Sequence, residues 1–173
     1  MLALDEAVAG GLTIPLVWNT CGWERLEVLE LLDGIVDIYL PDLKYASPAL
    51  SGGLSGAPDY FVKAQAALTE MYCQQPVLEI DPSGLARHGM IVRHLVLPGH
   101  SEDSCRVLDW LGARLSLSVG LSLMSQYIPC FEAPPDLQEA LTAEEYRAVQ
   151  AHAERLGFDS LFAFRFEGFG SWG

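Results

Sequence analysis

The chain has few basic residues and no cluster of them. Ten lysines and arginines stand against 23 aspartates and glutamates in 173 residues, which gives a formal net charge of −13. A surface of that sign repels a phosphate backbone, so the composition excludes nucleic acid as an expected partner.

Membrane and export signals are also missing. No apolar run approaches the roughly 20 residues that a membrane helix needs. The opening segment, MLALDEAVAGG, carries Asp5 and Glu6 and lacks the basic start of a secretory signal. We therefore expect a cytoplasmic protein that makes no membrane contact.

The four cysteines follow no metal-binding or cluster-binding spacing. They are Cys21, Cys73, Cys105 and Cys130, and their separations are too wide for a zinc site or an iron–sulfur loop. In a reducing compartment we expect free thiols, several of them in the core. The chain also lacks the G-x-S-x-G, P-loop and G-x-G-x-x-G motifs, which removes the common hydrolase, NTPase and dinucleotide-binding fingerprints.

Half of the residues are apolar and 19% are charged, which predicts one folded domain over residues 1–173. Apolar runs alternate with longer amphipathic segments. The predicted strands are Ile14 to Trp18, Ile35 to Leu40, Met90 to Leu97 and Val119 to Met124. The predicted helices are 24–32, 59–74, 102–115 and a last one between the capping box at Thr142 and Gly157. Strands with so little polar alternation favour a parallel sheet in an α/β fold.

Three further segments complete the predicted fold. Residues 77–90, with the turn signal Asp81-Pro-Ser-Gly84, predict a small β-hairpin that leads into the third strand. Residues 48–58, PALSGGLSGAP, predict a loop that is too short and too central to be a domain linker. Residues 160–166 predict a short terminal strand or an extended tail. The pattern fits either an open doubly wound sheet or part of a barrel.

Polar side chains follow each apolar run. They are Asn19 and Thr20 after the first, Asp42 and Lys44 after the second, Arg93 and His94 within the third, and Gln126 after the fourth. The carboxyl ends of parallel strands meet at one edge of a sheet, so these residues predict a binding site there. Taken singly, Asp42 and Lys44 also fit a surface ion pair. Arg93 and His94 point to opposite faces, and the histidine equally fits a satisfied core group.

Taken in order, these strand ends resemble a known pattern. VWNTCGW, GIVDIYLPDLKY, GMIVRHLVLPG and LSLMSQY are similar to the third to sixth strands of radical S-adenosylmethionine (SAM) activating enzymes. The resemblance runs from Leu2 to Gly157 and is nearest to homologues of the pyruvate formate-lyase-activating enzyme.

This resemblance implies a partial (β/α)6 barrel of which the chain supplies about the last four core strands, with their helices. In that family a Cys-x3-Cys-x2-Cys loop after the first strand binds a [4Fe–4S] cluster, which cleaves SAM to a 5′-deoxyadenosyl radical. The second strand carries a Gly-Gly-Glu motif near the SAM amino group. Neither motif occurs here, so we expect no cluster on this chain alone and no catalysis by it alone.

Carried over residue by residue, the resemblance implies a SAM site formed by Asn19, Thr20, Asp42, Lys44, Arg93 and Gln126. Lys44 would neutralise the methionyl carboxylate. Asp42 would need a cation or a bound amine beside it, and Asn19 stands where the activating enzymes have an aspartate.

Three functional hypotheses follow. In the first, the chain is the carboxy-terminal part of a radical SAM protein, with activation of a glycyl-radical enzyme as a candidate role. In the second, it is a non-catalytic α/β binding or scaffold subunit. In the third, it is one half of a split radical SAM enzyme. The expected partners are a protein substrate or the missing amino-terminal half.

Overall fold

The computed structural model describes residues 2–129 and 132–163. The fold is α/β, and its mostly parallel sheet has six strands. Five of these run parallel in the spatial order β1-β2-β4-β5-β6. Their bounds are Val17–Thr20 (β1), Ile38–Pro41 (β2), Ala86–Leu95 (β4), Gly120–Met124 (β5) and Ser160–Ala163 (β6).

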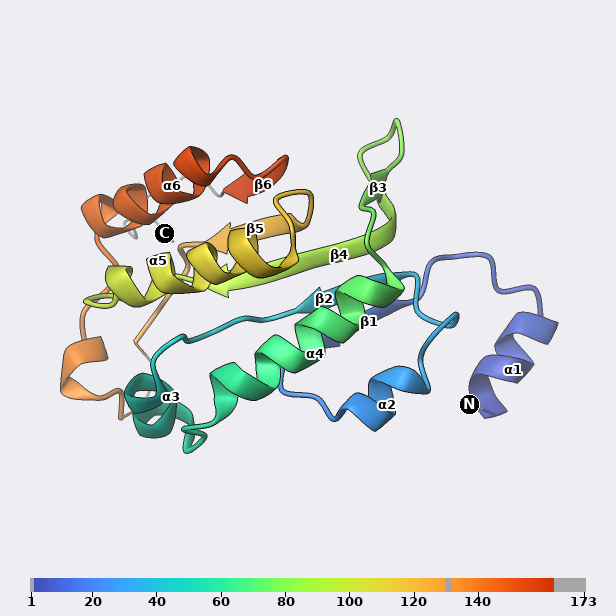
Figure 1. Cartoon of the computed structure of the whole chain (residues 1–173), viewed down its shortest axis with the longest axis horizontal. Coiled ribbons are helices and arrows are strands. Elements are labelled where there is room, and N and C mark those ends of the chain that lie inside the picture. The colour runs from blue at the N-terminus through green and yellow to red at the C-terminus, as the bar shows by residue number, and fades with distance from the viewer. Residues whose placement is uncertain (1, 130–131, 164–173) are drawn as a thin grey trace, which may run out of the picture.

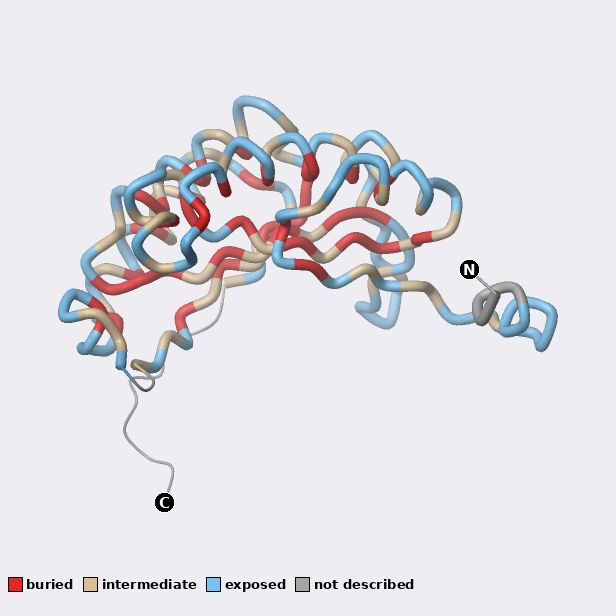
Figure 2. Tube along the Cα trace, turned by 90° about the horizontal axis from the view of Figure 1, so that it is seen from below, coloured by how far each residue is buried: buried red, intermediate tan, exposed pale blue. Residues whose placement is uncertain are grey.

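The spatial order of the parallel strands is their order along the chain, so every crossover advances in the same direction (Figure 1). Right-handed crossovers of this kind place the connecting helices on one face of the sheet. The α-helices in the described part of the chain are α1 (Leu2–Ala9), α2 (Leu26–Glu30), α3 (Pro48–Ser55), α4 (Tyr60–Gln74), α5 (Ser101–Trp110) and α6 (Ala143–Leu156), and a short 3₁₀ helix covers Pro135–Leu137. Figure 2 shows the sheet as an arch with helices along its outer side.

Burial alternates along the strands as this arrangement requires. In β4, Met90 and Val92 are buried beneath the helices, whereas Ile91 and Leu95 on the other face are only half-buried. We call this second side, the inner side of the arch, the open face. The strand register places Arg93 beside Ser122 of β5, so both lie on the open face.

The predicted hairpin is confirmed. Strand β3 (Glu79–Ile80) pairs antiparallel with the start of β4, which therefore begins at Ala86 rather than at Met90. The turn is held by Asp81, whose carboxylate accepts hydrogen bonds from the Ser83 and Leu85 amides.

The loop predicted for residues 48–58 is wrong, because these residues include helix α3. Ser47 caps it by accepting a hydrogen bond from the Leu50 amide at 3.3 Å, Pro48 occupies its first turn, and Gly56 ends it at φ 64°. Serine before proline and a terminal glycine are start and stop signals, and the glycine-rich composition concealed them.

Several predicted boundaries shift. Strand β1 begins at Val17, and Ile14 is 69% exposed. Helix α2 covers only Leu26–Glu30, and α5 passes at Leu111 into a π-helical turn that ends at Leu115. Of the two alternatives for residues 160–166, the terminal strand is confirmed over Ser160–Ala163, where β6 pairs parallel with β5, and residues 164–166 lie outside the described residues.

The capping box of α6 and its end at Gly157 are confirmed. The expectation of core cysteines is wrong for those that the structure describes. Cys21 and Cys73 are exposed and Cys105 is half-buried, while Cys130 lies outside the described residues. None of the helices in the described ranges combines the length and the apolar character that a membrane crossing requires.

Candidate functional site

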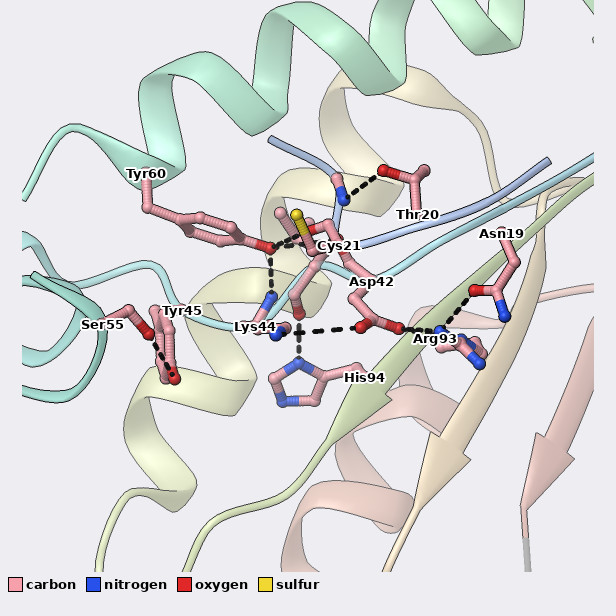
Figure 3. Close-up of polar contacts among 12 residues, drawn as sticks. Asn19, Thr20, Cys21, Asp42, Lys44, Tyr45, Ser55, Tyr60, Arg93 and His94 are labelled. Atoms are coloured by element: carbon pink, nitrogen blue, oxygen red, sulfur yellow. Dashed lines mark hydrogen bonds and ion pairs between the residues drawn. The ribbon is translucent and has the colours of Figure 1, made fainter. Parts of the chain in front are cut away.

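Arg93 links three neighbouring strands at the carboxyl end of the sheet (Figure 3). Its Nε donates to Asp42 Oδ1 at 2.8 Å, and its Nη2 lies 2.6 Å from the same oxygen. The same Nη2 donates to Asn19 Oδ1 at 2.8 Å. A backbone bridge joins Asp42 to Arg93, so the ion pair lies along the line where β2 meets β4. The guanidinium therefore provides, from within the chain, the cation that Asp42 needs.

Lys44 remains as the cation that points into open space beside this cluster. Its Nζ lies 4.0 Å from Asp42 Oδ2, and its side chain is 43% exposed. Asp42 and Lys44 thus share one face, as their alternate spacing predicts. Because Asp42 already pairs with Arg93 at shorter distances, Lys44 keeps most of its capacity to bind an anion.

A cavity of about 510 Å³ opens beside Lys44. Its polar wall is Asp42, Lys44 and Arg93, with Glu132 also on its lining. The remaining lining is mostly apolar or aromatic and comes from α3, β4, β5, Tyr45, Leu97 and residues 127–128, 133–134 and 137. Its volume lies within the range of about 300–1,000 Å³ that is usual for small-molecule sites, and apolar walls with a few charged groups are typical of such sites.

Three of the predicted site residues do not line this cavity, although one of them, Asn19, contacts Arg93 beside it. Thr20 is buried on the helix side of β1, where its hydroxyl bonds to Glu24 and accepts from the Gly22 amide at 3.2 Å. Gln126 is exposed and does not line the cavity. The structure therefore brings together Asn19, Asp42, Lys44 and Arg93 of the six predicted residues.

His94 is a core group. It is 1% exposed, its Nδ1 lies 2.6 Å from the Leu43 carbonyl oxygen and its Nε2 lies 2.9 Å from Ser104 Oγ. A carbonyl can only accept, so Nδ1 carries the proton and Nε2 accepts from the serine hydroxyl. Both nitrogens of the neutral ring are satisfied, and burial lowers the pKa of His94 below its usual value.

This lowered pKa predicts that His94 weakens the fold in acid. The unfolded chain binds a proton near pH 6.5 and the folded chain does not, so stability is lost as pH falls below that value. We expect the free energy of unfolding of the unaltered protein to fall by about 1 kcal/mol more than that of His94→Asn between pH 7 and 5.5. Urea titrations at both pH values measure this difference, and equal losses in the two proteins would contradict the prediction.

The cysteines that the structure describes cannot form one cluster-binding loop. Cys21 follows β1, Cys73 lies in α4 and Cys105 lies in α5. Among the described residues, no group of three or more His, Cys, Asp or Glu side chains is arranged to hold a metal ion. A [4Fe–4S] cluster needs several thiolates at one place, so these residues do not fit it.

No protein-family model matches the chain. The chain is similar to MJ0674 of Methanocaldococcus jannaschii, which is described as an uncharacterized protein. The two are 29% identical over 153 residues, which is 86% of this chain. The chain spans about 40% of the length of this curated relative.

Sequence reasoning missed two contributors to the site. The far wall of the cavity includes Ile128 and Leu137, the latter at the end of the 3₁₀ helix Pro135–Leu137. The Tyr60 hydroxyl, at the start of α4, bonds to the backbone that follows β1 and β2. No local signal marks either contribution, because each depends on how distant segments pack.

Proposed function

We propose that this chain is the carboxy-terminal part of a radical SAM protein, and that its open-face cavity binds the methionyl end of SAM. The observation that carries the proposal lies at the carboxyl end of the parallel sheet. There Lys44 is only loosely paired, at 4.0 Å, with an aspartate that Arg93 already neutralises. The resemblance of the four strand ends to the activating enzymes, which includes Asp42 and Lys44 themselves, also supports it. In this proposal the arch is part of a barrel.

The residues that line the cavity fit such a ligand. Lys44 binds the methionyl carboxylate by a charge-assisted hydrogen bond. Glu132 offers a negative charge to the amino and sulfonium groups, and the apolar lining from Leu95 and Met124 accommodates the carbon chain. Arg93 fixes the Asp42 carboxylate, which makes it a positioning residue in this site.

Reductive cleavage of SAM needs a [4Fe–4S] cluster, and the described residues do not fit one. The cluster loop therefore belongs to a further polypeptide segment, either upstream in a longer protein or in a separate subunit. The greater length of the relative is compatible with the first arrangement.

Joining the cluster segment to this chain tests the proposal. A Cys-x3-Cys-x2-Cys reading frame is sought in the genomic DNA upstream of and beside the gene, and its product is joined to or mixed with this chain without oxygen. We expect 5′-deoxyadenosine to form from SAM on addition of a reductant. Absence of such a reading frame, or of product from the complete assembly, would favour the scaffold hypothesis instead.

The chain alone is expected to hold no stable cluster. Anaerobic reconstitution with iron and sulfide, followed by desalting, should leave far less than one cluster per chain, because scattered cysteines bind iron weakly. Iron counting and electron paramagnetic resonance measure the outcome. Retention of four iron atoms per chain with a cluster signal would contradict the prediction.

A further inference from the structure

We infer that Tyr60 is the residue that positions Lys44 and Asp42 for ligand binding. Its hydroxyl ties the backbone that follows β2, which carries both charged side chains into the cavity, to the backbone that follows β1. The inference rests on the proposed function in one respect, because it takes the cavity beside Lys44 as the ligand site.

The tyrosine hydroxyl contacts three backbone groups (Figure 3). It lies 2.9 Å from the Cys21 carbonyl oxygen and 3.0 Å from the Asp42 carbonyl oxygen, and it accepts a hydrogen bond from the Lys44 amide at 3.0 Å. A hydroxyl has one proton and two lone pairs, so the two carbonyls share its proton while the amide uses a lone pair. One atom therefore holds both strand ends.

The surroundings leave this atom little freedom. Tyr60 is 3% exposed, and the Tyr45 ring packs edge-on against it with centroids 5.5 Å apart. A Cβ atom at Gly22, whose φ is +79°, would overlap the Asp42 carbonyl oxygen. The backbone after β1, at Gly22, and the backbone after β2, at Asp42, are therefore so close that only glycine fits at position 22.

Burial also keeps the hydroxyl in its donating form. It raises the pKa of Tyr60 above its usual value, and the nearby Asp42 carboxylate acts in the same direction. The proton is therefore retained at neutral pH and in moderately alkaline solution, and the contact to the two carbonyls persists there.

Positioning matters most for Lys44. A lysine side chain has many rotamers, and holding its amine in one place costs conformational entropy. Fixing the Lys44 amide removes the backbone part of that freedom before a ligand arrives, which raises affinity. Removing the hydroxyl leaves every charge and every cavity wall in place, so its effect separates positioning from charge.

The test compares Tyr60→Phe with Tyr39→Phe in the 173-residue chain. Tyr39 is a matched control because it is also fully buried and its hydroxyl bonds to Gln74, away from the cavity. We expect the Lys44 amide to exchange with solvent about tenfold faster in Tyr60→Phe, and SAM to bind about tenfold more weakly, as the loss of a hydrogen bond of typical strength implies. Tyr39→Phe should match the unaltered protein in both measurements.

Each result decides the inference. Unchanged exchange of the Lys44 amide in Tyr60→Phe would overturn it, and so would faster exchange with unchanged SAM affinity. If SAM binds neither to the unaltered protein nor to Tyr60→Phe, the proposed function fails. In that case, faster exchange of the Lys44 amide in Tyr60→Phe, together with a shifted Lys44 side-chain resonance, still supports the positioning role of Tyr60. If Tyr60→Phe does not fold, amide exchange is measured in the unaltered protein alone. A Lys44 amide that exchanges there as fast as in an unfolded chain would show that the hydrogen bond to Tyr60 is not formed, and would overturn the inference.

Discussion

Arg93→Leu is expected to lower the free energy of unfolding by about 2 kcal/mol, because it leaves the Asp42 carboxylate partly buried without its cation. The Asp42 and Arg93 side chains are 20% and 27% exposed, so the effect falls below that of a fully buried pair. Urea unfolding at neutral pH measures it. This variant also removes the hydrogen bond that Arg93 donates to Asn19 Oδ1.

Two controls separate loss of the ion pair from loss of the arginine itself. Arg25→Leu removes an exposed arginine that pairs with Glu27 at 3.5 Å, and its cost should stay below about 1 kcal/mol. Adding Asp42→Asn to Arg93→Leu should restore part of the lost stability, because it removes a half-buried charge whose remaining cation, Lys44, lies 4.0 Å away. Additive losses in the double variant would contradict the assigned role of Arg93.

Lys44→Ala is expected to weaken SAM binding about tenfold to a hundredfold. A hydrogen bond to a charged group contributes roughly 1.5–3 kcal/mol, and each 1.4 kcal/mol is about a factor of ten in affinity. Because the Lys44 side chain is 43% exposed and its nearest carboxylate is already paired, the fold itself should change little. Calorimetry without oxygen measures the affinity.

Lys63→Ala is the matched control for this change. The two lysines, Lys44 and Lys63, are the only ones in the sequence. Lys63 pairs with Asp59 at 2.9 Å and stacks on the Trp23 ring, on the helix side of the molecule. Its removal changes the net charge equally and should leave SAM affinity unchanged. An equal loss in both variants would mean that only overall charge matters.

The sequence was sufficient to predict the α/β class and the parallel sheet, because buried strands and helices have different apolar periods. It also predicted the hairpin at Asp81 and the caps of α6, which depend on residues close together in the chain. It failed at α3, where glycine and serine outweighed the capping signals. The sequence thus predicted an element correctly where its composition and its capping or turn residues agreed, and failed where they disagreed.

The site was predictable only in part. Alternate spacing placed Asp42 and Lys44 on one face, and adjacency placed Arg93 and His94 on opposite faces. The pairing of Arg93 with Asp42 depends on which strands are neighbours, and β2 lies beside β4 although 51 residues separate the partners. The contact of Tyr60 with both strand ends likewise follows from packing between helix and sheet.

The most direct measurement of the central claim is the spectrum of ¹³C-methylated lysines during a titration with SAM. The chain has only Lys44 and Lys63, so each signal can be assigned by its alanine variant. The account predicts that the Lys44 signal moves and saturates as SAM is added while the Lys63 signal stays in place. A Lys44 signal that stays in place throughout the titration, or moves only together with that of Lys63, would contradict the account.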